Sequence, residues 1–198
     1  MKLLLIADEE SPFLWDYFKP GMLDDVDAII SCGDLKPQYL SFLVTMCRAP
    51  LYYIHGNHDG RYATNPPEGC ECIEDKIIKI NGVRVMGLGG CLRYRPGPHQ
   101  YSDRQMLRRI FRMSWQLLIN RGVDVVVTHA PVRGIGDEEH VSHRGFRCFQ
   151  YVLKYLKPRY WFFGHVHARY GSQKSRVYHS GDTTLINACE RFVLEFDP

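Results

Sequence analysis

The chain has no long hydrophobic run and no large excess of charge of either sign. None of its apolar stretches approaches the roughly 20 residues that span a bilayer, and the run from Leu3 to Ala7 is too short for a signal peptide. The 25 Lys and Arg residues against 22 Asp and Glu leave a formal net charge of +3. So small a charge gives no reason to expect a nucleic acid or an anionic membrane as a partner.

The chain also lacks a set of paired cysteines. Its seven cysteines are scattered, and an odd number without paired spacing indicates free thiols in a reducing compartment, so we expect a cytoplasmic protein. Only Cys70 and Cys72 lie close together, and no second pair at zinc-ribbon spacing follows them. The cysteine pattern therefore does not predict a metal site.

The composition is that of a globular protein. Hydrophobic residues make up 45% and charged residues 24% of the 198 residues, a length that fits one domain over residues 1–198. Short β-rich apolar runs alternate with amphipathic stretches. We expect strands over residues 2–7, 28–31, 51–54, 76–80, 83–88, 123–128, 160–163, 176–179, 183–187 and 192–196, and helices over 12–18, 37–46, 103–120 and 146–156.

The order of these elements predicts a mixed α/β fold. Strands and helices alternate in the first part of the chain, which implies parallel pairing. Asn81-Gly82 is a hairpin signal, and the closely spaced C-terminal strands also imply antiparallel pairing. Three stretches have no clear element, 60–71, 93–102 and 129–145. The last is long for a compact domain and rich in His, Arg and acidic residues, which indicates a functional loop.

Chemically active side chains follow five of the expected strands. In open α/β sheets the ligand crevice lies beyond the carboxyl ends of the strands. His165 and His167 stand two residues apart, which places both imidazoles on one face of an extended segment and suits metal binding. The ordered set that the five strand ends deliver is Asp8, Asp34, Asn57 with His58, His129, and His165 with His167.

This ordered series resembles the motifs of the calcineurin-like metallophosphoesterases, which run Asp-x-His, Gly-Asp, Gly-Asn-His-Asp/Glu, His and Gly-His-x-His. Here they stand as Asp8-Glu9-Glu10, Gly33-Asp34, Gly56-Asn57-His58-Asp59, His129 and Gly164-His165-Val166-His167. The resemblance covers nearly the whole chain. It implies two packed mixed β-sheets flanked by helices, a four-layer α/β sandwich, with a dinuclear metal centre between the sheets.

The resemblance also implies a role for each residue. His58 would contact the phosphate and protonate the leaving oxygen without binding metal. Two divalent ions about 3.5–4 Å apart clamp phosphoryl oxygens and generate hydroxide near neutral pH. Asp59 is a candidate catalytic residue as well, because it can orient His58 or His129. The implied ligands are Asp8, the residue at position 10 and His167 for one ion, Asn57, His129 and His165 for the other, and Asp34 as the bridge.

Position 10 departs from the family pattern, because Glu10 stands where the family has His. Residues 8 and 10 share a face if the chain stays extended, so Glu10 can then reach the metal. An oxygen-rich ligand set would favour Mn, Mg or ferrous iron over Zn. The alternative is that Glu10 turns to solvent and that the first ion is held weakly.

Further polar residues flank the long loop. Arg133, His143 and Arg144 are candidate substrate-binding residues, since Arg144-Gly145 leads into a helix whose N-terminus can bind an anion. Solvated loop charges explain them equally well. The residues of the 93–102 stretch, Tyr94 among them, are expected to coat the surface rather than to line a pocket.

These observations together favour a metal-dependent phosphohydrolase, expected to be a phosphodiesterase that uses a dinuclear centre and a metal-activated hydroxide. The expected cofactors are two divalent ions, with Mn ahead of Fe, Mg, Zn or Ni, and the expected partner is a small phosphate ester. The alternative is a scaffold or adaptor that keeps the fold but has weak catalysis. A nuclease lacks support because the chain has neither an added capping domain nor a strongly basic composition.

Overall fold

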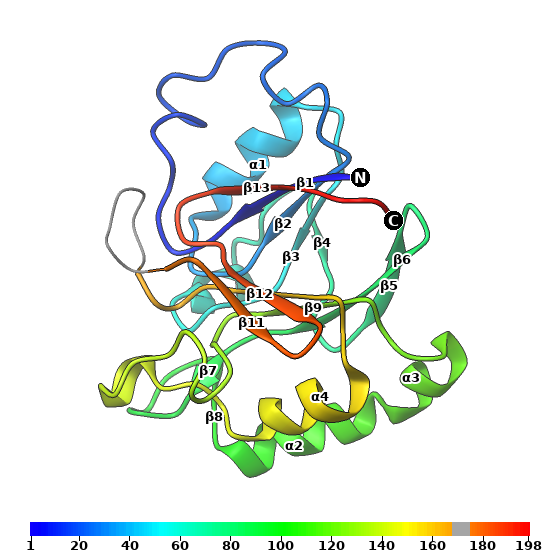
Figure 1. Ribbon diagram of the computed structural model, residues 1–198. Helices are drawn as coiled ribbons and strands as arrows, with labels where there is room; N and C mark the ends of the chain where they lie inside the picture. The colour runs from blue at the N-terminus through cyan, green and yellow to red at the C-terminus, as the bar shows by residue number, and fades with distance from the viewer. Residues whose placement is uncertain (168–174) are drawn as a thin grey trace.

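Two β-sheets packed face to face form the centre of the protein in the computed structural model, which describes residues 1–167 and 175–198 (Figure 1). The first sheet has the order β13-β1-β2-β3-β4 and the second the order β11-β12-β10-β9-β6-β5. The first consists of β1 (Lys2–Ile6), β2 (Ala28–Ser31), β3 (Leu51–Tyr53), β4 (Glu71–Cys72) and β13 (Phe192–Glu195). The second consists of β5 (Ile77–Ile80), β6 (Val83–Leu88), β9 (Val125–Thr128), β10 (Tyr160–Phe163), β11 (Val177–Ser180) and β12 (Thr183–Asn187).

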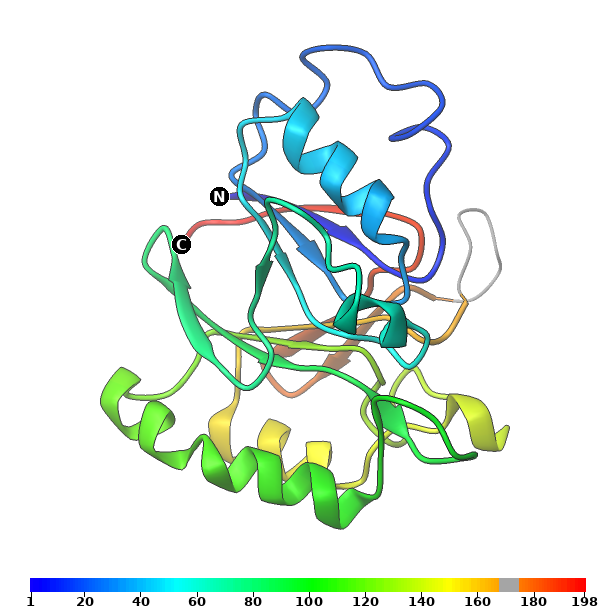
Figure 2. The ribbon, with the colours of Figure 1, turned by 180° about the vertical axis from the view of Figure 1, so that it is seen from behind.

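Helices cover the outer face of each sheet. Helix α1 (Pro37–Met46) lies over the first sheet, and helices α2 (Asp103–Arg112), α3 (Ser114–Asn120) and α4 (Cys148–Leu156) lie over the second (Figure 2). A small third sheet pairs β7 (Cys91–Leu92) with β8 (Gln100–Tyr101), and two short 3-10 helices, η1 (Asp59–Ala63) and η2 (Val141–His143), lie in loops. This four-layer sandwich confirms the predicted fold class. No helix in the described part of the chain is long and apolar enough to cross a bilayer.

Alternation along the strands separates the core into layers. Leu3 and Leu5 of β1 pack between the two sheets, whereas Leu4 points to the opposite side, towards α1. Val125 also lies between the sheets, while its neighbour Val126 packs towards the helices of the other face. Because both faces of these central strands are covered, Leu3–Ile6 of β1 and Val125–Val127 of β9 are apolar on every residue.

Both kinds of strand pairing occur. β1, β2, β3 and β4 are parallel to one another, as are β6, β9, β10 and β12. The Asn81-Gly82 hairpin joins β5 to β6 as predicted, with φ of 48° and 88° at the two turn residues. The carboxyl ends of the parallel strands are therefore free to carry functional side chains.

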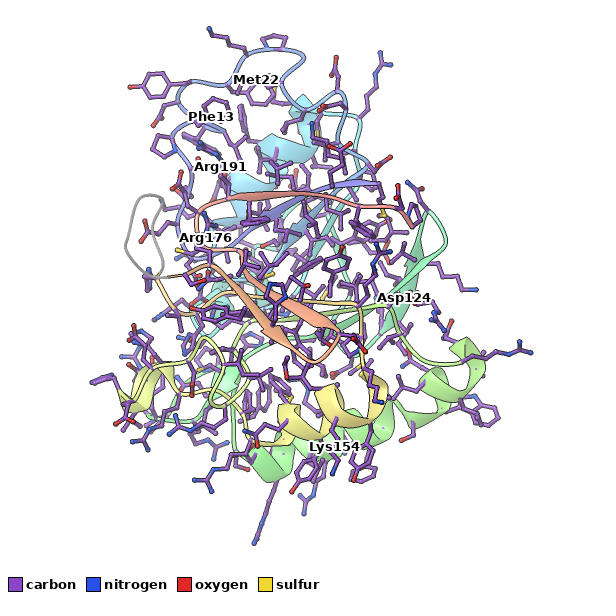
Figure 3. All side chains as sticks on the ribbon, viewed as in Figure 1. Phe13, Met22, Asp124, Lys154, Arg176 and Arg191 are labelled. Carbon is purple, nitrogen blue, oxygen red and sulfur yellow. The ribbon has the colours of Figure 1, made fainter. Side chains whose placement is uncertain are left out.

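Several expected elements differ from the structure. Residues 12–18 form successive turns instead of a helix, with the amide of Asp16 bonded to the carbonyl of Pro12 at 2.9 Å. Seven residues are too few for a stable isolated helix, and Arg191 fixes this segment instead by lying 4.4 Å from the ring centre of Phe13 (Figure 3). The long helix expected over 103–120 is interrupted at Met113, which is buried. The strands β4, β7 and β8 were not predicted, since each has only two residues.

Helix α2 begins with a capping box. The hydroxyl of Ser102 accepts a hydrogen bond from the amide of Gln105, and the Gln105 side chain accepts one from the Ser102 amide. We predict that Ser102→Ala lowers the free energy of unfolding by about 1 kcal/mol, measured by urea denaturation. Ser114 begins α3 without a side-chain cap, so Ser114→Ala is the matched control and is expected to change stability by less than about 0.5 kcal/mol. Equal losses in both variants would contradict the prediction.

Candidate metal centre

The carboxyl ends of β1, β2, β3, β9 and β10 meet at one edge of the sandwich. The chain continues there into Asp8, Asp34, Asn57, His129 and His165. A cavity of about 360 Å³ opens among them. It is lined by Asp8, Asp34, Asn57, His58, Tyr94, Ser142, His143, His165 and His167.

The backbone turns sharply at three of these residues. Asp8, Asp34 and His165 have φ of 63°, 61° and 68°, the left-handed region that non-glycine residues seldom adopt. Such strained residues persist where surrounding hydrogen bonds fix them, and they concentrate at functional sites. The Asp8 amide donates to the carbonyl of Gly33 at 3.1 Å, and the His165 amide lies 2.9 Å from both carboxylate oxygens of Asp8.

Glycines allow the loops of the site to touch. A Cβ atom on Gly33 would lie 2.3 Å from the amide nitrogen of Gly56, and one on Gly56 would lie 2.1 Å from an oxygen of Asp34. A Cβ on Gly164 would lie 2.7 Å from that of Ala7. The glycines of the three motifs are therefore required by close backbone approach.

Asp59 fixes the backbone of Asp34 by hydrogen bonding. Its carboxylate is almost fully buried, at 1% exposure, and the same oxygen accepts hydrogen bonds from the amides of Asp34 and Gly56, each at 2.7 Å. Burial and the charge of Asp34 raise the pKa of Asp59 to about 6. The hydrogen bonds of Asp59 go to backbone amides, so its expected role in orienting His58 or His129 stays a prediction.

Asp34 lies at the centre of the site. One carboxylate oxygen accepts the amide of His58 at 2.7 Å, and the other lies 3.3 Å from Nε2 of His129. Burial by itself would raise the pKa of Asp34, but the charge of His129 and the hydrogen bonds lower it to about 2. Asp34 is therefore an anionic carboxylate with one oxygen open towards the histidines.

His129 is fully buried, and both of its ring nitrogens face polar atoms. Nδ1 lies 2.8 Å from the carbonyl oxygen of Cys32, which can only accept, so Nδ1 carries a hydrogen. Nε2 lies 3.2 Å from Oδ1 of Asn57 and 3.3 Å from Oδ2 of Asp34. Burial alone lowers the pKa of His129, but Asp34 outweighs it and raises the pKa to about 9.

The convergence at Nε2 of His129 fits a divalent cation. A nitrogen, an amide oxygen and a carboxylate oxygen face one point. Without metal a proton occupies this point, and a cation can bind there by displacing the proton. The hydrogen bond from Nδ1 to a carbonyl is the support that metal-binding histidines commonly have. The donor set of Asp34, Asn57 and His129 therefore suits a metal ion.

His165 completes this donor set. Its Nε2 lies 2.5 Å from the carbonyl oxygen of Ser142, so the hydrogen sits on Nε2 and Nδ1 keeps its lone pair. Burial and the charge of His129 lower the pKa of His165 to about 3, which keeps the ring neutral. Asp34, His129 and His165 offer ligand atoms that all lie within 4.8 Å of one another.

The first expected metal site is more open. Burial raises the pKa of Asp8 to about 6, although the charge of His129 lowers it. His167 also lines the cavity, and its Nδ1 lies 3.1 Å from a carboxylate oxygen of Glu9. Glu9, His167 and Cys189 form a second group whose ligand atoms lie within 4.8 Å of one another.

The expectation that Glu10 faces the metal centre is not met. Its carboxylate pairs with Nζ of Lys36 at 2.9 Å, and Glu10 does not line the cavity. The argument for Glu10 assumed an extended chain, but β1 ends at Ile6 and the left-handed conformation of Asp8 breaks the alternation of side chains. The acidic residue beside His167 is Glu9 instead.

Of the three candidate substrate residues in the long loop, only His143 lines the cavity. Its ring lies 5.5 Å from that of His165, and its Nδ1 lies 3.0 Å from Glu138. Arg133 pairs with Asp137 at 2.7 Å, and Arg144 donates to a backbone carbonyl. The start of α4 is not an open anion site, since a side-chain oxygen of Asp103 accepts the first helical amide.

Two cavity residues were not predicted. Tyr94 was expected on the surface, but it lines the cavity and its hydroxyl lies 3.5 Å from Nδ2 of Asn57. Gln100 holds this loop by accepting the Tyr94 amide at 3.3 Å. Ser142 contributes its backbone carbonyl, which any residue has, so no sequence signal could identify it.

The model of the calcineurin-like phosphoesterase family matches residues 9–169, which is most of the chain. The chain belongs to this family. The motif residues that the fold brings together at the cavity therefore come from a family of phosphoesterases, as the order of the motifs indicated. The match carries no information on which substrate this member takes.

Relatives in animals share a moderate part of the sequence. UPF0046 protein T07D4.2 of Caenorhabditis elegans is 30% identical over 120 residues, covering 59% of this chain and 28% of its own length. UPF0046 protein K07C11.7 of the same organism is 25% identical over 199 residues, covering 84% and 63%. Metallophosphoesterase domain-containing protein 1 of Homo sapiens is 27% identical over 122 residues, covering 60% and 34%. The chain thus spans between about a quarter and two thirds of these relatives.

Solved structures share the fold at low identity. TT1561 of Thermus thermophilus superimposes with a TM-score of 0.61 at 14% identity, covering 96% of this chain and 89% of that one. The 5'-nucleotidase from Candida albicans has a TM-score of 0.59 at 14% identity, covering 94% and 45%. At this identity the likeness concerns the fold alone.

Asp59 offers a test of the support under the metal centre. We predict that Asp59→Ala lowers Mn²⁺ affinity about 10–100-fold, because the loops that carry Asp34 and Gly56 lose their shared acceptor. Titration calorimetry with Mn²⁺ measures the change. Asp59→Asn keeps an oxygen at the same place and is the matched control, expected to bind within a few-fold of the unaltered protein. Loss of affinity in both variants would show that the negative charge matters, not the acceptor.

Proposed function

We propose that this protein is a metal-dependent phosphohydrolase that cleaves phosphodiesters at a dinuclear centre. The observation that carries the proposal is the position of Nε2 of His129, which faces oxygens of both Asn57 and Asp34 at 3.2 and 3.3 Å. Family membership supports the same chemistry.

The proposed ligands divide between two ions. Asn57, His129 and His165 would hold one, in the closed part of the site. Asp8 and His167 would hold the other, with Glu9 rather than Glu10 as its further acidic neighbour. Asp34 would bridge the two, because it is the anionic carboxylate at the centre of the site. Divalent ions bound in this way activate water as a nucleophile and offset the charge of the phosphoryl group.

The residues of the chain then have separate tasks. Tyr94 bonds to the amide nitrogen of Asn57 and so directs its oxygen inward. Ser142 fixes the tautomer of His165 through its carbonyl. His58 is exposed at the cavity rim, anchored by its own amide to Asp34, and its imidazole is free to deliver a proton to the leaving oxygen.

A preference for diesters follows from the charges around the cavity. Among the described residues that line it there is no Lys or Arg, and Arg133 is paired with Asp137. The second negative charge of a dianionic monoester would be balanced by the metal ions alone. A monoanionic diester has no second charge to balance. The diester is therefore the better electrostatic match.

A scaffold role is the second candidate, and one surface favours it. Phe111, Trp115, Leu118, Tyr151 and Tyr155 of the helical layer are each 59–70% exposed, beside an apolar groove of about 430 Å³ between α2, α3 and α4. Exposed apolar patches of this kind commonly mark protein interfaces. The two roles are compatible, since this face is formed by other elements than the cavity.

Metal stoichiometry tests the ligand assignment. We predict two Mn²⁺ ions per chain by elemental analysis after dialysis against Mn²⁺, and one or none in Asp34→Asn, because the bridge is lost. Glu10→Ala serves as the control, since Glu10 pairs with Lys36. It should keep both ions. Loss of an ion in the Glu10 variant would return this residue to the ligand set.

The proposed role of His58 leads to a prediction for activity. His58→Asn should keep the metal content and lower turnover of a phosphodiester with a poor leaving group about 10²–10⁴-fold. The loss should be much smaller for a nitrophenyl diester, whose leaving group needs little protonation. A loss of the same size for both substrates, measured by steady-state kinetics, would remove His58 from the acid role.

A further inference from the structure

A second cluster of reactive side chains lies outside the metal centre. His55, Cys72 and Glu74 offer ligand atoms that all lie within 4.8 Å of one another. None of the three lines the metal cavity. Cys72 lies in β4, beside its register partner Tyr53 of β3, and is half-buried.

Glu74 fixes the imidazole of His55. One carboxylate oxygen of Glu74 lies 2.5 Å from Nδ1 of His55 and 3.3 Å from its backbone nitrogen. The other oxygen accepts a hydrogen bond from Arg109 at 2.6 Å. Arg109 is 8% exposed and also donates to the carbonyl of Gly89 at 2.8 Å and to Asp75. The carboxylate of Glu74 is therefore fixed by Arg109 on one oxygen, and its other oxygen orients the imidazole of His55.

The plane of the His55 ring is fixed as well. The ring of His99 stacks on it with centroids 4.4 Å apart and an interplanar angle of 6°. The rings of Tyr53 and Tyr62 pack against it at 5.6 and 5.5 Å. A cysteine, a histidine and a carboxylate arranged so that the carboxylate orients the histidine is the pattern that activates thiol nucleophiles.

Among the described residues, the other half-buried cysteines, Cys47 and Cys70, belong to no such cluster of possible ligands. In the described residues Cys32, Cys91, Cys148 and Cys189 are buried, and only Cys47, Cys70 and Cys72 are partly accessible. Burial raises the pKa of Cys47, and burial together with Cys47 raises that of Cys70 to about 12. Burial would also raise the pKa of Cys72, but hydrogen bonds from His55 and from the backbone of Glu74 outweigh it and lower that pKa.

We propose that Cys72 is a nucleophilic thiol and the site at which hydroperoxides and other soft electrophiles modify this chain. Its thiolate attacks one oxygen of the hydroperoxide, so that a sulfur–oxygen bond forms as the oxygen–oxygen bond breaks. The sulfur is oxidised to the sulfenic acid level and the peroxide is reduced. The leaving group is hydroxide from hydrogen peroxide or alkoxide from an organic hydroperoxide. It takes the proton of the sulfenic acid, which gives a sulfenate together with water or an alcohol.

A metal ion is the competing occupant of this cluster. The geometry favours the thiol, because both oxygens of Glu74 are already used by His55 and Arg109, and the guanidinium of Arg109 adds a positive charge that disfavours a divalent ion. His55 contacts this cluster and is followed two residues later by Asn57. A modification at Cys72 would therefore lie close to the segment that carries Asn57.

Site-resolved labelling tests the proposal without any assay of phosphoesterase activity. The native protein, dialysed against chelator, is treated with iodoacetamide at pH 7, and the labelling rate of each cysteine is followed by mass spectrometry. Cys72 should react at least about tenfold faster than Cys47 or Cys70, since an ordinary thiol is only a few per cent ionised at this pH. In urea the three rates should become equal. With hydrogen peroxide, dimedone should trap a sulfenate at Cys72 first.

Variants separate the role of the cluster from a general effect. Glu74→Gln should slow labelling of Cys72 about tenfold and leave Cys47 unchanged. Asp75→Asn alters a carboxylate that accepts from Arg109 and should leave Cys72 fast. Continued protection of Cys32 and Cys91 shows that each variant is folded. The proposal fails if Cys72 is no faster than Cys47, or if its advantage persists in urea. It also fails if Cys72 reacts only after chelation and is protected by added Zn²⁺, which would make the cluster a metal site.

Discussion

Two cross-sheet contacts hold the functional edge of this protein together. Nδ1 of His129, at the end of the second sheet, bonds to the carbonyl of Cys32 at the end of the first. The amide of His165 bonds in the same way to the carboxylate of Asp8. Each contact joins a strand end of one sheet to a strand end of the other, so the position of every proposed ligand depends on how the two sheets pack.

The same edge gathers more negative than positive charge. Asp8, Asp34 and Asp59 surround one imidazole, that of His129, and only Asp34 keeps a pKa near 2. Burial, together with the negative charge of Asp34, raises the pKa values of the other two carboxyls to about 6. A site of this kind favours cations, and divalent ions supply more positive charge than one protonated histidine.

Sequence reasoning located most of this edge because strand ends and buried apolar runs are visible in the sequence. Asp34, Asn57, His129 and His165 were placed correctly beyond their strands by that logic alone. Glu10 was misplaced, since the left-handed turn at Asp8 ends the strand period and leaves no trace in the residue types. Tyr94 was missed because its loop is folded by a hydrogen bond to Gln100, a contact between residues that no periodic pattern connects.

The two partners in the contact between Asp8 and His165 are 157 residues apart in the sequence. Closing so long a loop costs conformational entropy that only the completed sandwich can offset. The functional edge is therefore complete only when both sheets are in place. A cation held across it would act as a removable cross-link between the two halves of the chain, and its binding free energy would add to the stability of the whole fold.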